Sequence, residues 1–164
     1  MISDLILAKD AAIEAGGLIL NYYKAEYEIK DKGYHNPVTT ADHAADSYLK
    51  KVLKDARPEY GWLSEETVDS PERLTKDRVW VVDPLDGTKE FINKNGEFTV
   101  NIAFIKKGSP IMGVVHAPVI NKTWYGCIGL GSYKLNSINK RTEIKVDIPT
   151  KTSNLKIVSS RSHA

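Results

Sequence analysis

A short apolar run that ends in two aspartates constrains this chain more than any other feature. Residues 79–82 are Val-Trp-Val-Val, a mostly β-branched run that predicts a buried strand. The sequence then reads Asp-Pro-Leu-Asp-Gly-Thr, and Pro84 lacks the backbone donor that a sheet needs. We therefore expect the sheet to stop at Asp83 and the chain to turn at Gly87 into a helix, with Asp83 and Asp86 side by side.

The chemistry of this junction has two interpretations. The first N–H groups of the expected helix, at residues 87–89, would lie next to the two carboxylates. Oxygen ligands beside an anion-binding helix start suit a hard divalent cation that bridges to a phosphate. The alternative is that Asp-Gly is an ordinary turn signal and that Asp83 only caps the turn.

The Asp-Pro-Leu-Asp-Gly-Thr stretch resembles a signature of the lithium-sensitive, Mg²⁺-dependent inositol monophosphatase superfamily. The sequence after it, Lys-Glu-Phe-Ile-Asn-Lys-Asn-Gly-Glu-Phe-Thr-Val-Asn-Ile-Ala, is similar to one branch, the bacterial 3'(2'),5'-bisphosphate nucleotidases of the CysQ type. The resemblance implies a site with two or three Mg²⁺ ions and a small-molecule nucleotide substrate. It implies hydrolysis of adenosine 3',5'-bisphosphate to AMP and phosphate, in sulfur assimilation or nucleotide salvage.

An aspartate also begins a second amphipathic helix. We expect this helix to be capped by Thr39 or Thr40 and to end at Arg57-Pro58. Asp42 lies in its first turn, where the helix dipole favours a carboxylate without any further role. The stretch Pro-Val-Thr-Thr-Ala-Asp nevertheless resembles a second signature of the same superfamily, which implies that Asp42 pairs with Thr88 in catalysis.

A pair of glutamates follows a short apolar strand expected within residues 60–66. Neighbouring residues on a strand point to opposite faces, so one glutamate can face the site while the other does not. A solvated acidic loop is the alternative. Leu-Ser-Glu-Glu resembles a third signature of the superfamily, which implies that Glu65 is a metal ligand and takes part in catalysis.

The resemblance thus assigns a role to each candidate residue. The metal ligands are Glu65, Asp83, the Leu85 carbonyl and Asp86, and the catalytic residues are Asp42, Glu65 and Thr88. The substrate-binding residues are Asp86, Gly87, Thr88, Lys89, Arg161, Ser162 and His163. Two other functions stay open, an inositol or sugar monophosphatase and a non-catalytic fragment that binds metal or anions and needs a partner chain.

The expected fold class is α+β. Two long helices, the first over residues 2–24, would pack on a largely antiparallel sheet formed by residues 98–146. The Gly16-Gly17 pair weakens the first helix by roughly 1 kcal/mol per glycine, which indicates close packing of another element there.

The resemblance gives a first sugar-phosphatase domain over residues 1–150. Residues 151–164 would be the first strand of a second α/β domain that is otherwise missing. We therefore expect the chain alone to be inactive or nearly so. We also expect the surface that would contact this second domain to be covered by a second chain or by self-association.

Composition restricts the partners and the compartment. The chain has 23 basic and 21 acidic residues, which argues against a nucleic-acid polymer as partner. Its single cysteine, Cys127, cannot form an internal disulfide and is compatible with a reducing cytosol. No apolar run reads as a signal peptide or membrane span, so we expect a cytoplasmic protein, free or peripheral at the inner membrane.

Overall fold

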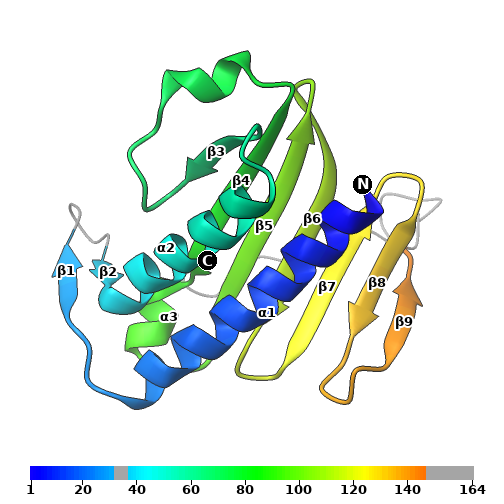
Figure 1. Ribbon diagram of the computed structural model, residues 1–164. Coiled ribbons are helices and arrows are strands. Elements are labelled where there is room, and N and C mark those ends of the chain that lie inside the picture. The colour runs from blue at the N-terminus through cyan, green and yellow to red at the C-terminus, as the bar shows by residue number, and fades with distance from the viewer. Residues whose placement is uncertain (32–36, 147–164) are drawn as a thin grey trace, which may run out of the picture.

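Two helices lie across one face of a seven-stranded sheet in the computed structural model, which describes residues 1–31 and 37–146 (Figure 1). The helices are α1 (Ile2–Lys24) and α2 (Thr40–Ala56). The strands of the sheet are β3 (Gly61–Ser64), β4 (Arg78–Asp86), β5 (Thr99–Lys106), β6 (Ser109–Ala117), β7 (Lys122–Cys127), β8 (Gly131–Leu135) and β9 (Arg141–Ile144). The smaller elements are β1 (Ile29–Asp31), β2 (Pro37–Thr39), the 3₁₀ helix η1 (Pro71–Thr75) and α3 (Thr88–Ile92).

The sheet is largely antiparallel, as the sequence predicts. Its strands follow one another in chain order from β3 to β9, and only β3 and β4 pair in parallel. The connection between those two strands contains η1. The expected α+β architecture of two long helices on a mostly antiparallel sheet is therefore confirmed.

Each long helix presents a face of small or aliphatic residues to the sheet. On α2 the residues Ala41, Ala45, Leu49 and Leu53 recur every four positions, and each is fully buried. Small side chains on both helices let the backbones approach the sheet closely. Burial of this apolar surface, at about 25 cal/mol per Å², is the main favourable term that holds the layers together.

Close packing explains one of the two central glycines of α1. A Cβ at Gly16 would lie 2.5 Å from Cδ2 of His116, a buried residue of β6. Gly17 is exposed, and a Cβ there would meet nothing within 4 Å. The prediction of a close approach is thus right for Gly16 and wrong for Gly17.

The sheet continues past the point where the sequence predicts its end. β4 runs on through Pro84 to Asp86, so the expected stop at Asp83 is wrong. Asp83 pairs with Asn101 and Asp86 with Thr99, which leaves one extra residue on β4, a β-bulge. Pro84 lies inside that irregularity, where a proline is tolerated. The bulge also resets the alternation of side chains, because residues three apart on a regular strand would face opposite sides.

Several predictions lie outside the described residues. They are the domain boundary at residue 150, the strand expected within residues 151–164, and the substrate-binding roles of Arg161, Ser162 and His163. Across the described ranges, none of the helices is both long enough and apolar enough to cross a membrane.

Candidate active site

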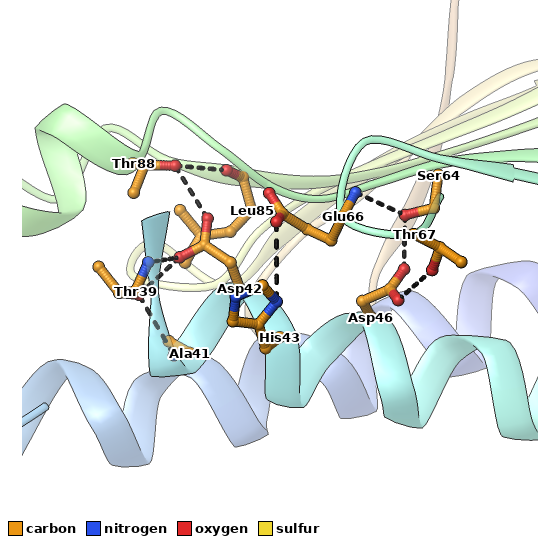
Figure 2. Close-up of polar contacts among 10 residues, drawn as sticks. All are labelled: Thr39, Ala41, Asp42, His43, Asp46, Ser64, Glu66, Thr67, Leu85 and Thr88. Carbon is orange, nitrogen blue, oxygen red and sulfur yellow. Dashed lines mark hydrogen bonds and ion pairs between the residues drawn. The ribbon is translucent and has the colours of Figure 1, made fainter. Parts of the chain in front are cut away.

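The first turn of α2 carries Asp42, which is almost completely buried. Thr39 is the N-cap of this helix, and its backbone N–H donates to Oδ2 of Asp42 at 2.8 Å. The Thr39 hydroxyl also donates to the same oxygen. This capping box fixes the Asp42 side chain and leaves its Oδ1 directed away from the helix start (Figure 2).

A glycine at the end of β4 brings a threonine to that oxygen. Gly87 has φ of +92°, and a Cβ there would lie 2.8 Å from the Glu97 carbonyl oxygen, so the turn requires glycine. The next residue, Thr88, starts α3, and its hydroxyl lies 2.9 Å from Oδ1 of Asp42 and 3.2 Å from the Leu85 carbonyl oxygen. With its single proton donated to Asp42, the Thr88 oxygen keeps lone pairs that can accept a hydrogen bond from water.

Negative charge gathers around Asp83, at the end of the regular part of β4. Burial of the side chain, followed by the charges of Glu65 and Asp86, raises the pKa of the Asp83 carboxyl to about 7. Its Oδ1 is buried and has no hydrogen-bond partner within the described structure. A carboxylate with an unsatisfied buried oxygen and acidic neighbours is the environment that a bound cation would relieve.

Of the two acidic neighbours of Asp83, Glu65 follows β3, whereas Asp86 is the last residue of β4. The Glu65 backbone N–H donates to the Val82 carbonyl at 3.3 Å, which extends the β3–β4 pairing and places Glu65 beside Asp83. Asp86 is exposed, and its Oδ2 accepts a hydrogen bond from the Asn101 side chain at 3.0 Å. Asn101 therefore orients Asp86, a role that the sequence did not indicate.

The candidate ligands have the chemistry that a hard divalent cation requires, although their side chains do not form a closed ligand group. Glu65, Asp83 and Asp86 supply carboxylate oxygens, and Leu85 supplies a carbonyl, which are the ligand types that Mg²⁺ takes in proteins. Within residues 1–31 and 37–146, no three acidic, histidine or cysteine side chains form a ready-made ligand group. Glu65 and Asp86 are both exposed, so a bound cation would draw their carboxylates toward that of Asp83.

Sequence reasoning missed Asp46, a second buried carboxylate of α2. It accepts hydrogen bonds from the hydroxyls of Ser64 and Thr67, which flank the two glutamates (Figure 2). The available signal was its spacing, because Asp46 lies four residues after Asp42 and so on the same helix face. His43, the residue after Asp42, is exposed, and its Nδ1 lies 3.8 Å from Oε2 of Glu66.

Comparison with known proteins shows where this arrangement belongs. The sequence profile of the Inositol monophosphatase family matches residues 3–164. The chain belongs to the inositol monophosphatase family. This match spans nearly the whole sequence, and it includes the three signatures around Asp42, Glu65 and Asp83 that suggested the family.

One curated relative within the inositol monophosphatase family is the 3'(2'),5'-bisphosphate nucleotidase CysQ of Escherichia coli K12. It is 40% identical to this chain over 156 residues, which are 93% of the chain and 61% of the relative. The chain therefore spans about three fifths of the length of this curated relative.

Two solved structures of the inositol monophosphatase family share the fold. CysQ from Bacteroides thetaiotaomicron has a TM-score of 0.74 at 34% identity, with 91% of this chain and 60% of that chain covered. The IMPase of Thermotoga maritima has a TM-score of 0.73 at 27% identity, with 79% and 50% covered.

Proposed function

We propose that this chain forms the metal-binding part of a Mg²⁺-dependent nucleotidase that hydrolyses the 3'-phosphate of adenosine 3',5'-bisphosphate. The observation that carries the proposal is the hydrogen bond from Thr88 to Asp42, beside the acidic cluster around Asp83. The choice of a nucleotide is supported by the 40% identity with a curated bisphosphate nucleotidase.

In this proposal the carboxylates of Glu65, Asp83 and Asp86, with the Leu85 carbonyl, hold the metal. Bound Mg²⁺ would neutralise charge on the phosphate and lower the pKa of a nearby water. Asp83 would be the central ligand, because Glu65 and Asp86 are both close enough for their charges to raise its pKa. Lys89 on α3 is exposed and adds positive charge on the side of the substrate.

Asp42 and Thr88 would orient the attacking water. The Asp42 carboxylate accepts the hydrogen bond that the Thr88 hydroxyl donates, so the Thr88 oxygen can only accept a hydrogen bond from the water. That contact turns a lone pair of the water toward phosphorus while the N–H groups at residues 87–89 bind the phosphate oxygens. Attack by water requires no side-chain nucleophile, and none of these residues needs to become covalently modified.

A second candidate is an inositol monophosphatase. Its support is the likeness to the Thermotoga maritima IMPase, at 27% identity and a TM-score of 0.73.

A third candidate is a fragment that binds metal without turnover, and its support is that the chain covers 61% of the Escherichia coli relative.

Phosphate release distinguishes these candidates. Adenosine 3',5'-bisphosphate and inositol 1-phosphate are supplied in parallel, with Mg²⁺ or with EDTA. Each assay is run with the chain alone and with a complementing segment, a second polypeptide that covers the part of a relative that this chain does not match. Asp83→Asn should abolish Mg²⁺-dependent turnover, and the matched control is Asp55→Asn, since Asp55 is an exposed carboxylate near the far end of α2.

The proposal predicts Mg²⁺-dependent release from the nucleotide at a rate at least ~10-fold above that from inositol 1-phosphate. The reverse preference would favour the inositol monophosphatase. Mg²⁺ binding without release from either substrate, even with the complementing segment, would favour the non-catalytic candidate.

A further inference from the structure

Asp46 holds the segment that carries the two glutamates. Its side chain is 7% exposed, and each carboxylate oxygen accepts one hydroxyl hydrogen bond. Oδ1 accepts from Ser64, and Oδ2 accepts from Thr67 at 2.6 Å (Figure 2). A buried carboxylate is stabilised only when such bonds are made, so these hydroxyls and Asp46 fix one another.

The Ser64 hydroxyl takes part in a second contact. It accepts a hydrogen bond from the backbone N–H of Glu66 at 3.3 Å while it donates to Asp46. Ser64 is the last residue of β3, and Thr67 follows the glutamates directly. The carboxylate of Asp46 therefore holds the chain on both sides of Glu65 and Glu66.

The position of Asp46 on α2 links this segment to the other half of the site. Asp42 and Asp46 are four residues apart, so their side chains lie one above the other on the same helix face. Asp42 binds Thr88, which follows β4, whereas Asp46 binds the segment that follows β3. One rigid helix thus sets the spacing between the water-orienting hydroxyl and the glutamate pair.

We propose that Asp46 is a positioning residue, which acts through Ser64 and Thr67 to hold Glu65 beside Asp83. Its effect on metal binding rests on the function proposed above, whereas the hydrogen bonds that it makes do not. Glu65 is exposed, so a loosened segment would let its carboxylate turn away into solvent. Groups that orient metal-binding side chains typically contribute about 10–100-fold to metal affinity.

The test removes one hydroxyl of this arrangement without changing its shape. Thr67→Val deletes the hydroxyl and Thr67→Ser retains it. The matched control is Ser70→Ala, because Ser70 lies in the same connection and its hydroxyl accepts from the Glu72 N–H rather than contacting Asp46. The readouts are hydrogen exchange at the Glu66 amide in metal-free protein and the Mg²⁺ dissociation constant from calorimetry.

Thr67→Val should speed Glu66 exchange by about 10-fold or more and raise the Mg²⁺ dissociation constant by about 10-fold. Thr67→Ser and Ser70→Ala should leave both values within about 2-fold of wild type. Asp46→Asn, which keeps the volume of the side chain, should act in the same direction as Thr67→Val and is the second variant if the valine protein does not fold.

Two results would overturn the inference. Unchanged Glu66 exchange in both Thr67→Val and Asp46→Asn would show that these bonds do not hold the segment. Faster exchange with unchanged Mg²⁺ affinity would show that the segment is held but that Glu65 needs no positioning. If wild-type protein binds no Mg²⁺, the proposed function fails and the metal-positioning role falls with it, while the exchange data still report separately on the hydrogen bonds.

Discussion

The hydroxyl of Thr88 donates a hydrogen bond to Oδ1 of Asp42 across 46 residues of sequence. Each residue is held for a local reason, since Asp42 closes a capping box on α2 and Thr88 follows a glycine with positive φ. A contact between two independently fixed groups loses little side-chain entropy when it forms. It is therefore well suited to hold a water in one orientation.

Thr88→Val tests this contact directly. Valine keeps the shape of threonine but lacks the hydroxyl, so turnover should fall by about 10²–10⁴-fold, the usual range for lost proton handling. We expect Mg²⁺ affinity to stay within about 2-fold, because the proposed metal ligands are other residues. Turnover is measured by phosphate release with the complementing segment present, and metal affinity is measured by calorimetry. Thr88→Ser is the control that should retain activity, and an equal loss of metal affinity in Thr88→Val would mean that Thr88 is structural.

Local patterns predicted most of the fold. The four-residue spacing of apolar side chains on α2 and the alternation along the strands after Phe98 reflect burial against a single sheet, and the structure confirms both. The end of the sheet was predicted wrongly at Asp83. A proline argues against a regular strand, but a one-residue bulge removes the need for the bond that proline cannot make, and nothing local in the sequence indicates a bulge.

Packing contacts between distant segments were harder to predict, as the two glycines of α1 show. Both weaken the helix equally by propensity, but only Gly16 lies against another side chain, the ring of His116. The two glycines themselves do not indicate which of them faces the sheet. That follows only from the position of the whole apolar face of the helix. Asp46 was missed for a related reason, since its partners Ser64 and Thr67 come from a different element.

Alanine at the two glycines should therefore have opposite effects on stability. Gly16→Ala places a Cβ 2.5 Å from the His116 ring and 3.1 Å from Pro118, so it should lower the free energy of unfolding by roughly 1–3 kcal/mol. Gly17→Ala has open space, and it should raise the free energy of unfolding by roughly 0.5–1 kcal/mol through helix propensity. Urea denaturation of both variants checks this, and destabilisation of equal size in the two would contradict the packing described here.

His116 predicts how stability depends on pH on the acidic side. Burial lowers the pKa of the imidazole below its ordinary value of 6.5, and Nδ1 lies 2.9 Å from the Thr123 hydroxyl. The folded protein then binds fewer protons than the unfolded chain as pH falls through 6.5, so the stability contributed by the neutral ring is lost in that direction. His116→Gln removes the titration and should flatten the decline in unfolding free energy between about pH 6.5 and pH 5. Parallel curves for wild type and variant, from urea denaturation across this range, would refute the assignment.

Asp83 yields the prediction that most directly connects stability with metal binding. In metal-free protein, burial and the charges of Glu65 and Asp86 raise its pKa to about 7, so ionisation of this carboxyl costs the folded state stability. The unfolded chain releases this proton near pH 3.8, and stability therefore falls as pH rises from about 4 to 7. Asp83→Asn removes the charge with almost no change in volume. In EDTA at pH 7.5 it should raise the free energy of unfolding by roughly 1–3 kcal/mol, and the gain should shrink toward pH 4.

The same substitution should remove the response to Mg²⁺. Wild-type protein should gain thermal stability with added Mg²⁺, by about 2.7 kcal/mol when the free ion is at 100 times its dissociation constant, because the ion binds the folded state. Asp83→Asn should be insensitive to Mg²⁺, so that the order of stability reverses: the variant is more stable in EDTA and the wild type is more stable at saturating Mg²⁺. The control Asp55→Asn, at an exposed position of α2, should leave the wild-type response intact. A Mg²⁺-dependent rise in melting temperature that is equal in wild type and Asp83→Asn would place the metal elsewhere on the molecule.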